Sequence, residues 1–153
     1  MIQRIQSVYL LIAVVAMILP IFIPFGHLLN ATTNDVIDIT TFSAVNARSE
    51  VVEYMWPSFV LTIINVLFTF VVILSFKKRI AQIRLATMDV LVYIGNCILT
   101  AVLAYLLSSN CEGYSFMMTF VVTFPIFVII AFFLAVRAIG ADEALVRSAD
   151  RLR

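Results

Sequence analysis

The sequence has little charge and few of the residues that build catalytic or metal sites. Its 153 residues include one histidine, two cysteines and four glycines, and only 12% of them are charged. One histidine without clustered carboxylates is too little for a metal site or for general-base catalysis. The sequence also has no glycine-rich phosphate loop and no serine nucleophile motif. We therefore predict a protein that is not an enzyme, with no catalytic residues, no metal and no cofactor.

The two cysteines do not match the redox pair of a membrane thiol oxidoreductase. Such enzymes need neighbouring thiols, as in Cys-x-x-Cys, whereas Cys97 and Cys111 are fourteen residues apart. On one helix that separation is about 21 Å, well beyond the roughly 7 Å Cα limit for a disulfide. We expect no bond between them, and whether Cys111 pairs with another chain stays open.

Charge is absent altogether from four long apolar stretches. They contain 22, 23, 22 and 24 residues, and they are 5–26, 54–76, 90–111 and 113–136. Because a helix rises about 1.5 Å per residue, each could cross the roughly 30 Å hydrocarbon core of a bilayer. Hydrophobic residues make up 63% of the chain, more than in a typical soluble domain. We predict an all-α fold, a single membrane domain (1–153) built as an antiparallel four-helix transmembrane bundle.

The basic residues predict the orientation of this bundle. Nine of the ten lie before the first stretch, between the second and third, or after the fourth: Arg4, Lys77, Lys78, Arg79, Arg84, Arg137, Arg147, Arg151 and Arg153. Short basic loops stay in the cytoplasm. Both termini, the loop 77–89 and the tail 137–153 are therefore predicted to be cytoplasmic, and the loop 27–53 to lie outside.

The segments around the spans give weaker signals. The outer loop 27–53 fits either a small β-hairpin or irregular structure, and both stay open. Pro125 lies inside the fourth stretch, where we expect it to kink the helix. Gly140 precedes a run that begins with Asp142 and Glu143, so we predict a short amphipathic cytoplasmic helix after it.

Polar residues form a stripe on each of the two middle spans. The stripes are Ser58, Thr62, Asn65 and Thr69, and Asp89, Tyr93, Asn96 and Thr100. Each is spaced 4, 3 and 4 residues, which places its members on one helix face. Because lipid supplies no hydrogen bonds, we expect the stripes to face each other.

Counting residues from the nearest basic anchor predicts a register for this seam. Asn65 is twelve residues from Lys77, and Asn96 is twelve from Arg84. Asn65 should then meet Asn96, with Thr62 near Thr100 and Thr69 near Tyr93. The seam has two interpretations, helix packing or a binding site for a small molecule. Asp89 also has two, the start of a helix or a functional intramembrane charge neutralised by Arg84 or by a neighbouring helix.

The two ends of the chain carry distinctive sequence. The chain begins MIQRIQSVYLL and ends DEALVRSADRLR. With the length and the four apolar stretches, these ends resemble a family of small four-span inner-membrane proteins of Bacteroidota, catalogued as a domain of unknown function. The resemblance implies a bacterial inner (cytoplasmic) membrane and no known activity. On the predicted cytoplasmic side, the two ends could form one docking patch made of Arg4, Gln6, Arg147, Asp150 and Arg151.

Two functions from different classes follow. The leading hypothesis is an accessory or scaffold protein whose cytoplasmic ends dock a membrane-protein partner or a second copy. The alternative is a small transporter, or a protein that binds a lipid or small molecule, and that uses the seam between the second and third spans. An enzyme is a weak third. Membrane lipids are expected partners in either case, and nucleic acid is not.

Overall fold

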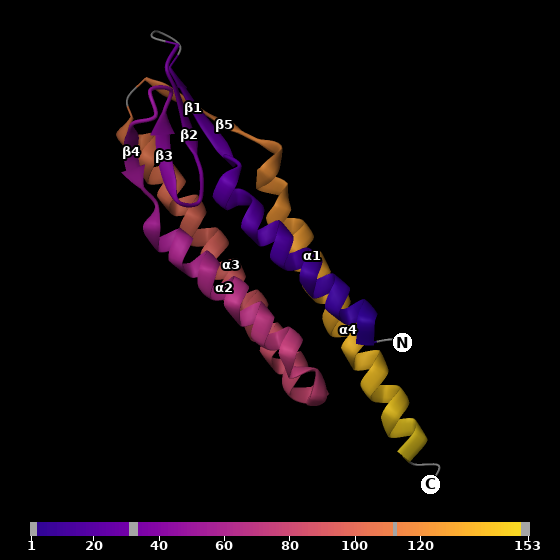
Figure 1. Cartoon of the computed structure of the whole chain (residues 1–153). Coiled ribbons are helices and arrows are strands. Elements are labelled where there is room, and N and C mark those ends of the chain that lie inside the picture. Colours follow the sequence, from indigo (N-terminus) through magenta and orange to yellow (C-terminus); the bar gives the residue numbers. More distant parts are fainter. Residues whose placement is uncertain (1–2, 31–33, 112, 151–153) are drawn as a thin grey trace.

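The computed structural model describes residues 3–30, 34–111 and 113–150, which contain four α-helices and a five-stranded antiparallel sheet (Figure 1). The helices are α1 (Gln3–Phe22), α2 (Trp56–Leu74), α3 (Arg79–Asn110) and α4 (Phe124–Asp150). The strands are β1 (Gly26–Asn30), β2 (Val36–Ile39), β3 (Ser43–Asn46), β4 (Val51–Tyr54) and β5 (Tyr114–Met118). Two short 3-10 turns are η1 (Ser75–Lys77) and η2 (Phe120–Thr123). The prediction of an all-α four-helix bundle is therefore wrong.

The helices lie side by side, and the sheet is at one end of them (Figure 1). Helix α1 packs against α4 and α2, and α3 packs against α2 and α4. Both termini lie toward the end opposite the sheet, where the turn between α2 and α3 also lies (Figure 1). The protein thus has a sheet end and a terminal end.

The sheet joins two segments that are far apart in the sequence. Its order is β4-β3-β2-β1-β5, and all neighbouring strands are antiparallel. The first four strands fill most of the predicted outer loop 27–53, whereas β5 follows α3 and pairs with β1. One face of the sheet is buried through Leu28, Ile37 and Ile39, which belong to a core cluster with Ala104 and Leu107 of α3. The sheet therefore packs on the ends of the helices.

The fourth charge-free stretch, 113–136, is only partly helical. Gly113 has a φ of +82°, a left-handed conformation that suits glycine, and it turns the chain from α3 into β5. The helix begins at Phe124, so Pro125 is its second residue and not a kink in its middle. Proline fits the first turn because that turn needs no backbone N–H from it. An absence of charge does not distinguish an apolar strand from an apolar helix, and this prediction failed for that reason.

Three further boundaries differ from the prediction. Helix α1 ends at Phe22, and Gly26 of the first stretch belongs to β1. The predicted cytoplasmic loop 77–89 is mostly helix, because α3 begins at Arg79. Helix α4 runs through Gly140 to Asp150, so no separate amphipathic helix follows the fourth stretch. A single glycine inside a helix costs about 1 kcal/mol relative to alanine, which a long helix tolerates.

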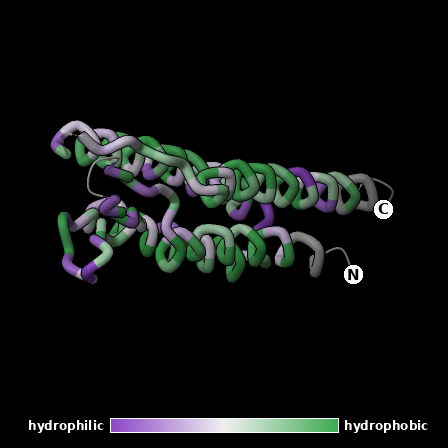
Figure 2. Tube along the Cα trace, turned by 90° about the horizontal axis from the view of Figure 1, so that it is seen from above, coloured by the Kyte–Doolittle hydropathy of each residue, from purple (hydrophilic) through white to green (hydrophobic). Residues whose placement is uncertain are grey.

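The surface of the helices is apolar. Among the described residues, three helices are long and apolar enough to cross a membrane, namely Trp56–Leu74, Arg79–Asn110 and Phe120–Leu145. The apolar part of α1, Ser7–Phe22, is shorter. Large side chains such as Leu67 (60% exposed) and Phe133 (66% exposed) point outward, and hydrophobic residues predominate along the helices in Figure 2. A surface of this kind is compatible with a membrane protein.

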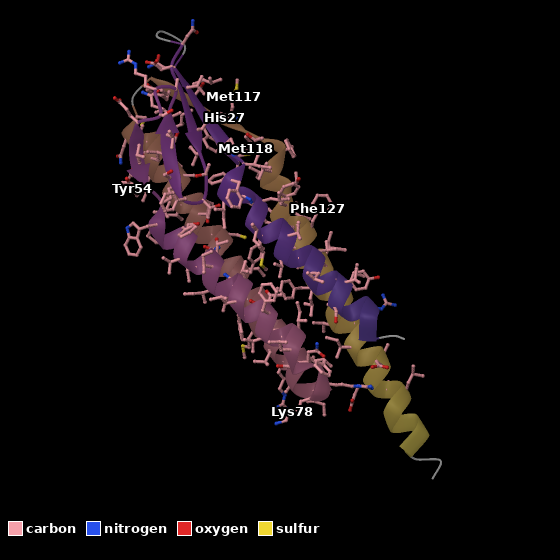
Figure 3. The ribbon with its side chains drawn as sticks, in the orientation of Figure 1. His27, Tyr54, Lys78, Met117, Met118 and Phe127 are labelled. Atoms are coloured by element: carbon pink, nitrogen blue, oxygen red, sulfur yellow. The ribbon has the colours of Figure 1, made fainter. Side chains whose placement is uncertain are left out.

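The pairing of β1 with β5 can be tested by a disulfide. His27 and Met117 are direct partners across these strands (Figure 3), and directly opposed Cβ atoms are about 4.5–5.5 Å apart. In a chain with Cys97→Ala and Cys111→Ala, we expect His27→Cys and Met117→Cys to cross-link on mild oxidation, as seen by a mobility shift on gels.

The control moves the second cysteine to Met118, whose side chain lies on the other face of the strand. We expect no cross-link there. Equal cross-linking at both positions would contradict the strand register.

Candidate functional site

The two polar stripes meet in a seam between α2 and α3. The Asn96 Nδ2 donates a hydrogen bond to the Thr62 Oγ1 at 2.9 Å. The Thr69 Oγ1 donates to the Asp89 Oδ2 at 2.7 Å. The hydroxyls of Ser58 and Thr100 also bond to each other. The polar residues of the two helices thus form an antiparallel ladder.

The predicted register of this seam is wrong by about one helical turn. Asn96 bonds to Thr62 and not to Asn65, and Thr69 bonds to Asp89 and not to Tyr93. The prediction assumed that Lys77 and Arg84 lie at the same depth along the helix axes. Because α3 begins at Arg79, Arg84 is already five residues inside the helix, about 7.5 Å beyond its first residue. In the observed register, Asn65 lies level with Tyr93.

The threonine hydroxyls of the seam also lie close to carbonyls of their own helices. Thr62 donates to the Ser58 carbonyl and Thr100 to the Asn96 carbonyl, both at 2.9 Å. The Thr69 hydroxyl lies 3.0 Å from the Asn65 carbonyl, but its one hydrogen goes to the closer Asp89 oxygen. Thr62 gives its hydrogen to Ser58, so its oxygen is left to accept from the Asn96 amide. This arrangement fixes which way the Asn96 side chain faces.

Three acceptor atoms in the seam have no hydrogen-bond partner within the described residues. They are the Oδ1 atoms of Asn65, Asp89 and Asn96. Asn65 and Asp89 are fully buried. Unpaired buried acceptors are uncommon in native proteins because they lower stability. These three oxygens are therefore the atoms of the seam that can still accept a hydrogen bond.

Asp89 is not at the start of a helix, as one interpretation had it. It is the eleventh residue of α3, its side chain is 0% exposed, and its recorded hydrogen bond comes from Thr69. The predicted partner Arg84 is an exposed residue. The Thr69 hydroxyl also lies 4.0 Å from the Met17 sulfur of α1, so this part of the seam touches a third helix.

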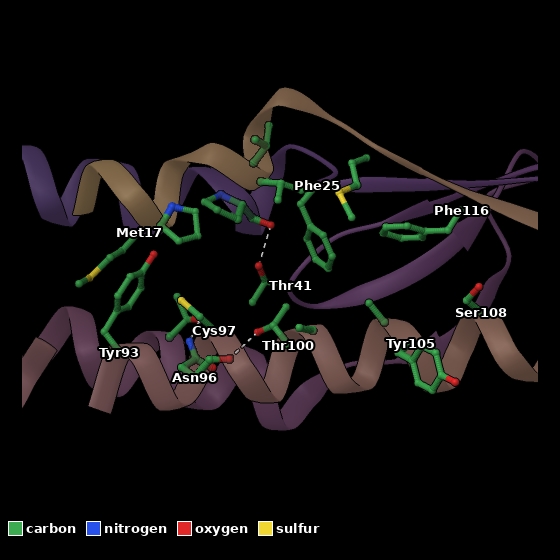
Figure 4. Close-up of a pocket in the computed structure, with 18 residues that line it drawn as sticks. Met17, Phe25, Thr41, Tyr93, Asn96, Cys97, Thr100, Tyr105, Ser108 and Phe116 are labelled. Carbon is green, nitrogen blue, oxygen red and sulfur yellow. Dashed lines mark hydrogen bonds between the residues drawn. The ribbon is translucent and has the colours of Figure 1, made fainter. Parts of the chain in front are cut away.

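A cavity of about 370 Å³ lies beside the seam (Figure 4). Thr62, Tyr93, Asn96 and Thr100 of the seam contribute to its wall. The rest is mostly apolar and includes Met17, Phe25, Phe116, Ala101 and Val121. Small-molecule sites in proteins have volumes of about 300–1,000 Å³ and apolar walls with a few polar groups, and this cavity fits that description.

The cavity depends on the segment that the sequence analysis assigned to a helix. Five of its lining residues come from β5, η2 and the start of α4: Phe116, Met118, Val121, Val122 and Pro125. Thr41 also lines the cavity, and its hydroxyl donates to the Pro20 carbonyl at 2.9 Å, which ties the sheet to the end of α1. The extended segment Tyr114–Met118 and the end of α1 at Phe22 together leave the space open.

Sequence reasoning missed several residues of this region. Cys97 and Tyr105 line the cavity, and Gln82 extends the seam by donating to the Val72 carbonyl at 3.1 Å. Cys97 and Cys111 are both free thiols. The sequence did carry a signal for Cys97, because Cys97, Ala101, Ala104 and Ser108 are spaced 4, 3 and 4 residues, as on one helix face, and all four line the cavity. Among the described residues, no three His, Cys, Asp or Glu side chains group as metal ligands would.

The predicted docking patch lies outside what the structure describes. This holds for the side chains of Arg4, Gln6, Arg147 and Asp150 and for all of Arg151. At the same end, the Arg79 Nη1 forms an ion pair with Asp142 at 3.1 Å and donates to the Asp142 carbonyl at 3.0 Å. This contact holds the start of α3 against α4.

Comparison with known protein families gives a match over nearly the whole chain. The model of a domain of unknown function, DUF4293, matches residues 2–152. The chain belongs to the DUF4293 family. The expectation of an uncharacterised family, drawn from the two ends, is thereby confirmed. No curated protein matches the chain.

The Thr69–Asp89 bond should matter for stability. We expect Thr69→Val to lower the free energy of unfolding by about 1–3 kcal/mol, because it leaves a buried carboxyl group without its donor. The measurement is unfolding in detergent micelles followed by circular dichroism.

The matched control is Thr87→Val. Thr87 is on α3, two residues before Asp89, but it is exposed and its hydroxyl donates to its own helix, at the Ile83 carbonyl. We expect its change to stay within about 0.5 kcal/mol. Equal losses in the two variants would show that the cross-helix bond contributes nothing.

Proposed function

We propose that this protein is a non-enzymatic membrane protein that binds a lipid-like molecule in the cavity beside the seam. The observation that carries this proposal is the cavity itself, of about 370 Å³, with polar groups gathered on its α3 wall. Tyr93, Asn96 and Thr100 supply those groups, whereas Phe25, Phe116 and other apolar residues face them across the space (Figure 4). A molecule with an apolar body and one polar end fits such a wall.

The seam between α2 and α3 is closed, which supports placing the ligand in the cavity and not in the seam itself. Ser58, Thr62, Asn65 and Thr69 are all at most 4% exposed, and three hydrogen bonds link them to α3. A closed, bonded interface favours helix packing over a path for solute. We therefore place the ligand next to the seam, where the same α3 residues reach the cavity.

We further propose that the protein lies in a bacterial inner membrane with its terminal end in the cytoplasm. Lys78, Arg79 and Arg84 are in or next to the turn between α2 and α3, away from the sheet. Basic residues of this kind are retained on the cytoplasmic side. The sheet would then face the outside, where water can satisfy its edges.

Filling the cavity tests this function. Ala101 lines the cavity, whereas Val102, the next residue of α3, does not, and both residues are exposed. We expect Ala101→Trp to reduce the amount of co-purifying lipid-like molecule by about tenfold, since a bulky side chain takes the space of the ligand. Mass spectrometry of organic extracts from the purified protein gives the readout.

Val102→Trp is the matched control, because it adds the same side chain on the lipid-facing side. It should retain as much ligand as the unmodified chain. If both variants lose the ligand equally, or if the unmodified chain carries none, the cavity is not a binding site.

A second candidate, the accessory or scaffold role, is supported by α4. This helix continues to Asp150 and projects past the turn between α2 and α3 (Figure 1). The Arg79–Asp142 pair fixes its direction. A projecting helix braced at its base is suited to bind a membrane-protein partner or a second copy of the chain.

Truncating the end of α4 tests this role without removing the Arg79–Asp142 ion pair. We expect a chain ending at Leu145 to insert normally, because the Arg79–Asp142 pair and the apolar part of α4 remain. Its co-purifying protein partners should be lost, as measured by mass spectrometry after mild solubilisation. An unchanged set of partners would end this proposal.

A further inference from the structure

We infer that the hollow at the start of α3 binds the phosphate headgroup of an anionic phospholipid. The hollow lies where η1 leads into α3, at the terminal end of the protein near Lys78 (Figure 3). Lys78, Arg79 and Arg84 line it, together with apolar residues of the same helix and Glu143 of α4. The site is separate from the cavity beside the seam.

Two of the three cations are available for a ligand. Arg79 is engaged by Asp142 at 3.1 Å. Lys78 and Arg84 are exposed, and within the described residues neither has a recorded ion pair. Asp89, the expected counter-ion of Arg84, is bonded to Thr69 instead. Lys78 and Arg84 thus face the same hollow, and the Asp89 carboxylate neutralises neither charge.

The acidic residues do not cancel this charge. Asp142 is used by Arg79, and Glu143 has an interaction of its own. Three cations against two carboxylates leave a positive balance around the hollow. Lysine and arginine are the side chains that bind phosphate oxygens in proteins.

The apolar lining favours a lipid over a free phosphate ion. Ile80, which is 46% exposed, and Leu85 lie among the cations. A phosphate held by Lys78 and Arg84 would place its acyl chains against these residues. Basic pockets between helices at the cytoplasmic side of a membrane bind anionic headgroups in this way.

The Arg79–Asp142 contact prepares the hollow. It joins α3 to α4 through both the carboxylate and the backbone carbonyl of Asp142, so the walls are held before a lipid arrives. Binding to a site held in place loses less conformational entropy. The inference rests on the membrane placement proposed above, and it is independent of any ligand in the cavity.

The test uses the full chain, delipidated in detergent and titrated with phosphatidylglycerol or phosphatidylcholine of identical acyl chains. Native mass spectrometry counts the bound lipid. We expect the unmodified chain to hold one phosphatidylglycerol in preference to phosphatidylcholine. The double variant Lys78→Gln/Arg84→Gln should bind it about tenfold more weakly, since each cation near the surface contributes to anionic lipid binding.

Arg137→Gln is the matched control, because Arg137 is an exposed cation of α4 that does not line the hollow. It should bind phosphatidylglycerol as the unmodified chain does. Equal loss in this control, or equal binding of the two lipids by the unmodified chain, would overturn the inference. So would displacement of phosphatidylglycerol by millimolar inorganic phosphate, which would indicate a free-anion site.

Folding and the cavity are checked on the same variants, and the cavity ligand is measured before delipidation. The double variant should keep its helical circular dichroism and its cavity ligand, which separates this inference from the proposed function. If the double variant unfolds, the single variants Lys78→Gln and Arg84→Gln replace it. Each should then weaken phosphatidylglycerol binding more than Arg137→Gln does, and failure to do so counts against the inference.

Discussion

Polar side chains buried among the apolar helices must find their hydrogen-bond partners within the protein, because apolar surroundings supply none. The seam between α2 and α3 meets this requirement for its hydroxyl groups, whereas one side-chain oxygen each of Asn65, Asp89 and Asn96 has no partner within the described residues. Its hydroxyls bond to carbonyls one turn back in their own helices, and they also bond across to the neighbouring helix. Such bonds contribute about 0.6 kcal/mol each in membrane proteins. Their main effect is to fix which residues of α2 and α3 lie opposite each other. That register also determines the positions of Tyr93, Asn96 and Thr100 on the cavity wall.

The same requirement explains why the strands are gathered at one end. An open sheet edge cannot lie in hydrocarbon, and both edge strands, β4 and β5, are at the end away from the termini. Because β5 takes up residues that would otherwise begin α4, the helix starts only at Phe124. The space between this late start and α3 becomes the cavity, with Phe116 and Val121 from the connecting segment on its wall.

Local signals in the sequence predicted the middle of the molecule and failed at its ends. The apolar stretches 54–76 and 90–111 contain α2 and much of α3, and the 4-3-4 spacing placed Thr62, Asn65 and Asn96 in the seam. The strand at Tyr114–Met118 could not be read locally, because its helix-or-strand state is decided by β1, about ninety residues earlier in the chain. The cavity could not be predicted from the sequence, for a related reason. It is a space between α1, α3 and β5, and no single segment encodes it. The predicted register of the seam was wrong because Arg84 was taken to mark the start of α3, whereas it lies five residues inside that helix.

The position of β1 inside the sheet, between β2 and β5, has a consequence for how the protein is assembled. β1 emerges from synthesis early and pairs with β2 on one side, but its neighbour on the other side is β5, which follows α3. Until α2 and α3 have been made and the chain has returned to the sheet, one edge of β1 has no strand beside it. An exposed edge of this kind attracts other strands. The sheet therefore closes only after α3 has been made, and one edge of β1 is open to other strands until then.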